Sequence, residues 1–133
     1  MDVLTQLSGE HEALRVHLER IESAAVARDD RGLLAALEAA RPALTEELDT
    51  HIDLEEAEVF APVGESIGEG LVAPFREEHV EVRALRDDIF AAIGRGETPY
   101  AASLRLCDLI SDHQRREDGM LFPSARSSLG VLS

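Results

Sequence analysis

The chain is short of the residues that build disulfides and thiolate metal sites. Its 133 residues include one cysteine, Cys107, and no tryptophan. A single cysteine cannot form a disulfide within the chain, and it cannot supply the several thiolates that zinc–thiolate and iron–sulfur sites require. We expect Cys107 to be a small buried residue, which leaves histidine and carboxylate side chains as the candidate metal ligands.

Positive charge and long apolar runs are also scarce. The 27 acidic residues outnumber the 13 basic ones and give a formal net charge of −14. Such a charge disfavours nucleic acid and anionic membranes as partners. No apolar run reaches the roughly 20 residues of a membrane-spanning helix, and the first residues show no charged-then-apolar leader. We therefore expect a cytoplasmic protein.

The composition is that of one α-helical domain. Aromatic residues make up 4% of the chain and apolar residues 44%, and no stretch shows sustained strand-type alternation. Apolar residues instead recur at spacings of three and four, which is typical of helices with one buried face. The four helices predicted in this way span about 3–28, 33–60, 71–93 and 98–123.

The breaks between these segments carry helix-ending signals. Pro42 predicts a bend or two abutting helices, and the glycines and proline of 61–70 predict a connection. Asp29 or Asp30 can cap the second helix, and Thr98 before a proline predicts the start of the fourth. The fourth helix is expected to stop near Pro123.

Short links between four amphipathic helices predict an all-α, up-down-up-down four-helix bundle. We place this bundle in residues 1–123 and a C-terminal tail in residues 124–133.

Four histidines occupy positions on the apolar stripes, one in each predicted helix. They are His11, His51, His79 and His113. Two come early in the first and third helices, and two come late in the second and fourth. An antiparallel bundle therefore brings all four to a similar level near one end. His17 lies on the flank of its stripe, and we expect it at the surface.

Two glutamates accompany these histidines at helical spacing. Glu55 follows His51 by four residues, and Glu117 follows His113 by four, so each pair shares one helix face. One histidine on an apolar face is more often a core residue than a ligand. Four at one level, with two acids one turn further on, are rare by chance, and burying two carboxylates is costly without a cation. The six side chains therefore predict a metal site.

The donor types limit the metal. Imidazole and carboxylate suit iron, manganese or zinc and disfavour copper(I). Six donors exceed what one tetrahedral zinc needs, whereas two ions bridged by carboxylates are known in the cores of helix bundles. We therefore favour two iron ions over manganese or zinc.

The order and spacing of these residues resemble the hemerythrin-like, HHE cation-binding family from about residue 3 to residue 123. The shared pattern is His11, His51-x3-Glu55, His79 and His113-x3-Glu117, with Val59-Phe60 and Leu121-Phe122-Pro123 after the acids. The resemblance implies a non-heme di-iron centre, bridged by carboxylate and oxo or hydroxo groups, and chemistry with dioxygen or its relatives. It also implies that the histidines are terminal ligands, that Glu55 is a bridge, and that Glu117 or Asp118 is the second bridge.

One position departs from the oxygen-carrying members of this family, which place a second histidine four residues after the one in the third helix. Arg83 stands there, and arginine cannot lose its charge and bind a metal. Glu58, one turn beyond Glu55, is the candidate replacement, ahead of His17. We expect Arg83 in the second shell, pairing with a nearby acid on the solvent side or, as an alternative, holding an anionic ligand.

Fewer histidine ligands leave more metal positions open to exchange, which favours redox turnover over reversible oxygen transport. We predict a di-iron protein that binds or reduces O2, peroxide or NO, with peroxide consumption of a catalase or peroxidase kind as a candidate activity. An iron or oxygen sensor without turnover is the alternative. A metal-free helical interaction bundle is a weaker one.

Overall fold

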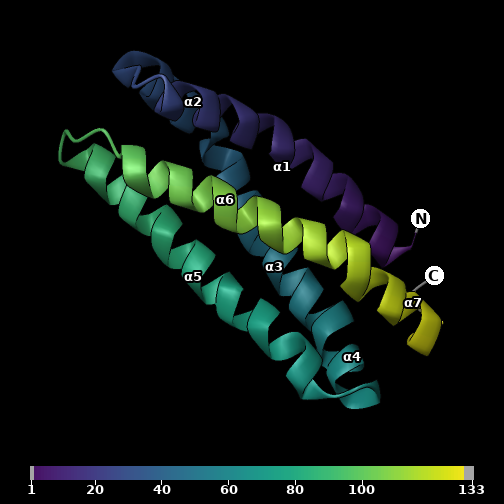
Figure 1. The fold of residues 1–133 in the computed structure, drawn as a ribbon. Coiled ribbons are helices and arrows are strands. Elements are labelled where there is room, and N and C mark those ends of the chain that lie inside the picture. Colours follow the sequence, from purple (N-terminus) through teal and green to yellow (C-terminus); the bar gives the residue numbers. More distant parts are fainter. Residues whose placement is uncertain (1, 131–133) are drawn as a thin grey trace.

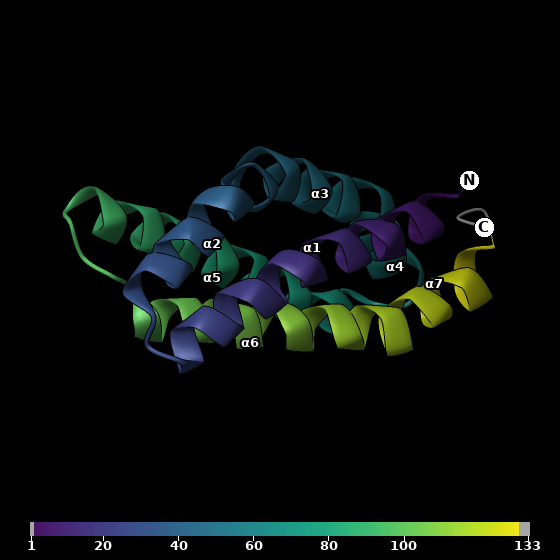
Figure 2. The same ribbon diagram turned by 90° about the horizontal axis from the view of Figure 1, so that it is seen from above.

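The structure, a computed structural model, describes residues 2–130. It is 91% helical, with no strand in that range. Four helical rods run alternately up and down, and the start of the first rod lies at the same end of the bundle as the end of the fourth (Figures 1 and 2). The all-α, up-down-up-down bundle predicted from the sequence is confirmed.

Two rods are single helices and two are composite. The first rod is α1 (Val3–Val26) and the third is α5 (Glu69–Gly94). The second contains α2 (Asp30–Pro42), the π-helix η1 (Ala43–Glu47), α3 (Leu48–Glu55), the π-helix η2 (Glu56–Phe60) and α4 (Ala61–Ser66). The fourth contains α6 (Tyr100–Arg116), the π-helix η3 (Glu117–Leu121) and α7 (Phe122–Leu129).

Prolines lie inside these rods without ending them. η1 follows Pro42, so the expected interruption is a change of winding in a continuous rod. Pro62 and Pro123 lie in the first turns of α4 and α7, directly after the π-helices η2 and η3. The connection predicted over 61–70 is confined to 67–68, and the predicted helix end near Pro123 is wrong. The second rod runs to Ser66, and the fourth runs to Leu129.

The caps agree with the sequence in one place and differ in another. Asp29 caps α2, where its carboxylate accepts the Gly32 N–H at 3.0 Å. Thr98 does not cap α6, which begins after Pro99 without a side-chain cap. The connection between α4 and α5 is tight, and Gly68 there has a φ of 143°, a conformation that favours glycine.

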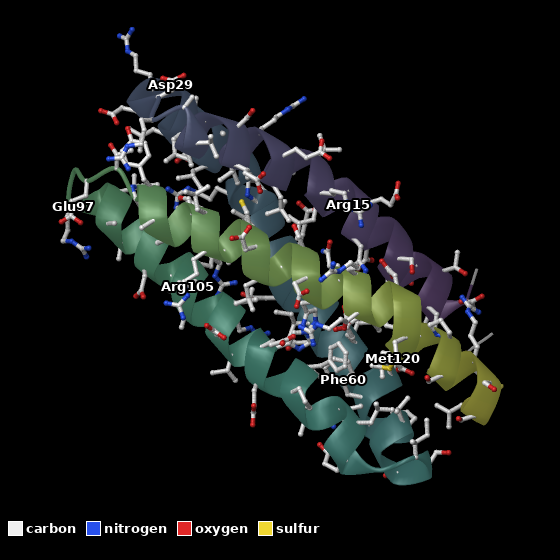
Figure 3. All side chains as sticks on the ribbon, in the orientation of Figure 1. Arg15, Asp29, Phe60, Glu97, Arg105 and Met120 are labelled. Carbon is white, nitrogen blue, oxygen red and sulfur yellow. The ribbon has the colours of Figure 1, made fainter. Side chains whose placement is uncertain are left out.

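Two separate apolar clusters fill the bundle. The loop-end core lies toward the turns that Asp29 and Glu97 mark in Figure 3 and includes Leu18, Ile21, Leu37, Ile89 and Leu106. The terminal core lies toward α4 and α7 and includes Leu4, Val59, Phe60, Phe75 and Phe122. Burying one such side chain contributes about 1.5–3 kcal/mol. The buried histidines and glutamates lie in sequence between the members of the two cores.

Cys107 belongs to the loop-end core, as expected from the sequence. Its S–H group donates to the Leu18 carbonyl oxygen at 3.5 Å. Burial raises the pKa of this thiol to about 12, so it is held as the unreactive neutral form. The described helices include none with the length and apolar character needed to cross a bilayer.

Candidate metal centre

Each rod places one histidine in the layer between the two cores. His11 lies on α1, His51 on α3, His79 on α5 and His113 on α6. Each histidine occupies a position of the buried stripe of its helix that would otherwise hold an apolar residue. The imidazole is therefore buried together with the stripe. Their side chains are between 1% and 11% exposed, with His51 the most exposed.

Glu55 lies at the centre of these histidines and is fully buried. Its Oε1 lies 2.9 Å from Nε2 of His79 and 3.7 Å from Nε2 of His113. Its Oε2 lies 3.5 Å from Nε2 of His51 and 3.9 Å from Nε2 of His11. One carboxylate therefore presents a different oxygen to each pair of histidines.

Glu117 is also fully buried and divides its oxygens in the same way. Its Oε1 lies 3.2 Å from Nε2 of His11, and its Oε2 lies 3.1 Å from Nε2 of His113. Both glutamates thus span the two halves of the layer, which is the geometry of a bridging carboxylate.

These six residues form two groups of four potential ligands, and the donor atoms within each group lie within 4.8 Å of one another. Group A contains His11, His51, Glu55 and Glu117. Group B contains His79, His113 and the same two glutamates. Two cations held in this way would share both carboxylates.

The buried donor atoms lack other partners. Both oxygens of Glu55, both oxygens of Glu117, and Nε2 of His11 and His113 are buried without a hydrogen-bond partner among residues 2–130. Buried polar atoms without partners are rare and costly in native proteins. The lone pairs converge on two points, and the nitrogen and oxygen donors suit iron, manganese or zinc. The residues present therefore fit a pair of such ions.

A second set of carboxylates holds the outer nitrogen of every histidine. Nδ1 of each ring lies 2.7–3.1 Å from a carboxylate oxygen; the partners are Glu10 for His51, Glu56 for His79, Glu78 for His113 and Asp118 for His11. An ionised carboxylate can only accept, so Nδ1–H donates and the lone pair on Nε2 points inward. Such outer partners orient metal-binding histidines and raise their basicity.

The outer carboxylates follow one rule in both halves of the centre. The acid just before an early histidine contacts the late histidine of the next rod, as Glu10 does with His51. The acid just after an inner glutamate contacts an early histidine, as Asp118 does with His11. The centre therefore has a pseudo-twofold pattern. In the sequence, these acids stand directly before His11 and His79 and directly after the two inner glutamates. Glu10, Glu56 and Glu78 were not predicted from this pattern.

The π-helices begin at or directly after the two inner glutamates. η2 begins one residue after Glu55 and ends at Phe60, whereas η3 begins at Glu117 and is followed by Phe122. Both phenylalanines contact a histidine ring. Phe60 stacks on His79, with centroids 5.1 Å apart and planes at 18°, and its side chain lies inside the bundle (Figure 3). Phe122 stacks on His11 at 5.7 Å and 15°. Single π-helical turns are frequent at functional sites.

Three residues considered as alternative ligands lie outside both ligand groups. Glu58 is exposed on η2 and joins neither ligand group, because the wide π turn rotates it away from the face that an α-helix would give it. Asp118 contacts the outer nitrogen of His11, whereas Glu117 belongs to both ligand groups. His17 is half-buried on α1 and also lies outside both groups.

Arg83 is the solvent-side partner of two acids. Its guanidinium donates to Asp49 at 3.1 Å and to Asp53 at 3.0 Å, both on α3. Arg83 therefore links α5 to α3. None of its described hydrogen bonds and ion pairs involves one of the six inner side chains. With Arg83 in place of a histidine, the two ligand groups have the same composition.

The inner glutamates share protons when no cation is bound. Burial and the neighbouring Glu55 carboxylate raise the pKa of Glu117 well above its usual range. Two carboxyl groups this close do not both ionise readily in a low-dielectric interior, so the pair retains a proton. A bound cation would displace that proton and allow both carboxylates to ionise.

Metal affinity is expected to fall on acidification. Burial lowers the pKa of His11, but Asp118 and Glu117 outweigh it and leave the pKa raised; Glu55 and Glu10 do the same for His51. Protons therefore compete with the metal as pH falls below the raised pKa values, which lie above the ordinary value of about 6.5. Chelator competition between about pH 8 and pH 6 should show a loss of about tenfold per pH unit for each proton released. A pH-independent affinity over that range would contradict this assignment.

Glu78→Gln is expected to weaken metal binding by about 10–100-fold, because the outer carboxylate fixes and polarises His113. Glu78 lies 2.7 Å from Nδ1 of His113 and also pairs with Arg116. Glu77→Gln is the matched control, because Glu77 is its exposed neighbour. Affinities measured by chelator competition should separate the two variants; equal affinities would show that the outer contact is unimportant.

Comparison with known families gives one match. A sequence model described as the hemerythrin HHE cation binding domain matches residues 2–125. No curated protein and no solved structure matches the chain significantly. The matched range contains both ligand groups and all four outer carboxylates.

Proposed function

The chain belongs to the hemerythrin HHE cation-binding family, and from that premise we propose that it binds two iron ions in the bundle core and there binds or reduces dioxygen, peroxide or nitric oxide. The observation that carries this proposal is the pair of four-donor groups that share both glutamates. Family membership supports a cation, and the shared carboxylates favour two ions over one.

In this proposal each ion takes two imidazoles and two shared carboxylate oxygens from the protein. Four protein ligands leave positions for exchangeable ligands on iron, which accepts up to six. Bound iron supplies electrons and a site for an oxygen-derived ligand. The chain holds the Nε2 lone pairs inward through the outer carboxylates, and the two apolar cores limit the access of water.

Peroxide is the substrate we favour for turnover. Its disproportionation reduces one molecule to water while oxidising another to dioxygen, so no external electron donor is required. Arg83 pairs with Asp49 and Asp53 and supplies no ligand, so each ligand group has only two histidines. This composition supports exchange of ligands at the metal over tight binding of oxygen.

Metal analysis and an optical spectrum of aerobically purified protein test the proposal. Close to two iron ions per chain are expected, one for each ligand group, with near-ultraviolet charge-transfer bands that change on addition of peroxide. Oxygen evolution from peroxide should collapse in His113→Ala. Less than one iron per chain after iron-replete expression would overturn the proposal.

A sensor without turnover is the second candidate, favoured by the position of the ligands on all four rods between two separate cores. Metal occupancy would then control how tightly the terminal core is held. A sensor should lose much of its helicity on iron removal and evolve no oxygen from peroxide. Turnover without a large structural change would exclude it.

A further inference from the structure

A cavity of about 460 Å³ lies between α1 and the η1–α3 segment and reaches the centre at His51. His51 is the most exposed of the four ring ligands, and its outer partner Glu10 also lines the cavity. Ala13 on α1 and Ala43 at the start of η1 are small residues on opposite walls of the cavity. Of the four members of group A, His51 is the one that lines the cavity.

Gln114 adds a buried, unsatisfied amide to the residues that line the cavity. It lies on α6 next to His113, is only 4% exposed, and lines the cavity. Its Oε1 is buried without a hydrogen-bond partner in the described part of the chain. A buried amide oxygen in this state is destabilising unless a donor reaches it. Water, hydrogen peroxide or the hydration shell of a cation can supply that donor, whereas a bare anion cannot.

The ionised groups along the cavity are acidic. Glu10, Glu46 and Glu47 line it, and its lining includes no arginine. Low-dielectric walls of one sign of charge concentrate ions of opposite sign and repel those of the same sign. The net charge of −14 acts in the same direction.

We propose that this cavity is the passage by which cations and uncharged small ligands reach the metal centre, and that its carboxylates hold anions back. The inference rests on the proposed metal centre and specifies its ligands further. Glu46 and Glu47 select the entering ligands by charge, and Gln114 positions a hydrogen-bond donor beside His51.

The charge filter is tested by Glu46→Gln combined with Glu47→Gln. Azide is the anionic probe and nitric oxide the uncharged one, each added to iron-loaded protein at low ionic strength. Azide should bind about tenfold faster than in the unmodified protein, nitric oxide at an unchanged rate, and iron(II) uptake by the metal-free protein should slow. Added salt should remove these differences. The control is Glu65→Gln with Glu77→Gln, an equal change of charge at exposed residues that do not line the cavity.

The route itself is tested by blocking it. Ala13→Trp places a large side chain at the cavity and should slow azide, nitric oxide and iron(II) alike by about tenfold or more, with the final iron content unchanged. Ala84→Trp, at an exposed alanine of α5, is the control for the added indole. Far-ultraviolet circular dichroism checks the fold of each variant, and Ala43→Trp repeats the test from the opposite wall.

The outcomes separate the two proposals. A chain that takes up no iron would overturn the metal centre and the passage together. Iron uptake with unchanged probe rates in the glutamine pair and in both tryptophan variants would overturn the passage alone. If the Glu65/Glu77 control variant changes azide binding to the same extent, the effect comes from net charge alone. That result would also overturn the passage.

Discussion

Replacing Glu55 and Glu117 together by glutamine is expected to abolish metal binding at the proposed centre. Each glutamate offers one oxygen to group A and the other to group B, so neither group keeps an anionic ligand. The neutral amides also place N–H groups where lone pairs are required. Metal content should fall from the level of two ions to near zero, and any near-ultraviolet bands should vanish.

Glu58→Gln is the matched control for this variant. It makes the same chemical change once, on the rod that holds Glu55, at an exposed residue outside both ligand groups. Its metal content should equal that of the unmodified protein. The double variant should remain helical when metal-free, because it loses two buried ionisable groups that lack partners. Retention of iron by the double variant would show that the glutamates are not the bridging ligands.

Removing the metal is expected to lower the free energy of unfolding by several kcal/mol. A ligand that binds only the folded state stabilises it by about 4 kcal/mol at a free concentration 1,000 times its Kd. The metal-free protein also leaves the buried atoms of Glu55, Glu117, His11 and His113 without partners. Denaturant unfolding with and without a chelator measures the difference. The Glu55→Gln/Glu117→Gln variant should show none.

The loss of stability should be uneven along the bundle. The terminal core is the smaller of the two apolar clusters and is separated in sequence from the loop-end core by the metal ligands. Amide hydrogen exchange of the chelated protein should therefore accelerate first in α4 and α7, while the part of α6 around Leu106 stays protected. Equal acceleration in both cores would contradict this division.

The bundle and the inner residues of the centre could be predicted because each follows from a regular pattern. Apolar spacing defined four helices, and His11 and His79 occupied gaps in that spacing. Glu55 lay one α-helical turn from His51, so both fell on one face before any winding changed. Antiparallel order then placed the early and late histidines at one level.

The remaining features depend on contacts that helical periodicity does not encode. Glu10, Glu56 and Glu78 are three of 27 acids, and only the packing of neighbouring rods shows which acids face an imidazole. Glu58 was misplaced because α-helical spacing was assumed across a π turn. Pro62 was interpreted, together with the glycines after it, as part of a connection, but it lies in the first turn of α4.

The π turns η2 and η3 also determine where the chain can change length. Each wide turn brings Phe60 or Phe122 into contact with a histidine. Deleting one residue there would remove the wide turn and leave α-helical winding in its place. Inserting a further residue would rotate the downstream helix by about 100° and turn the terminal core outward. Insertions should therefore be tolerated in the turns around Asp29 and Glu97 and rejected in η2 and η3.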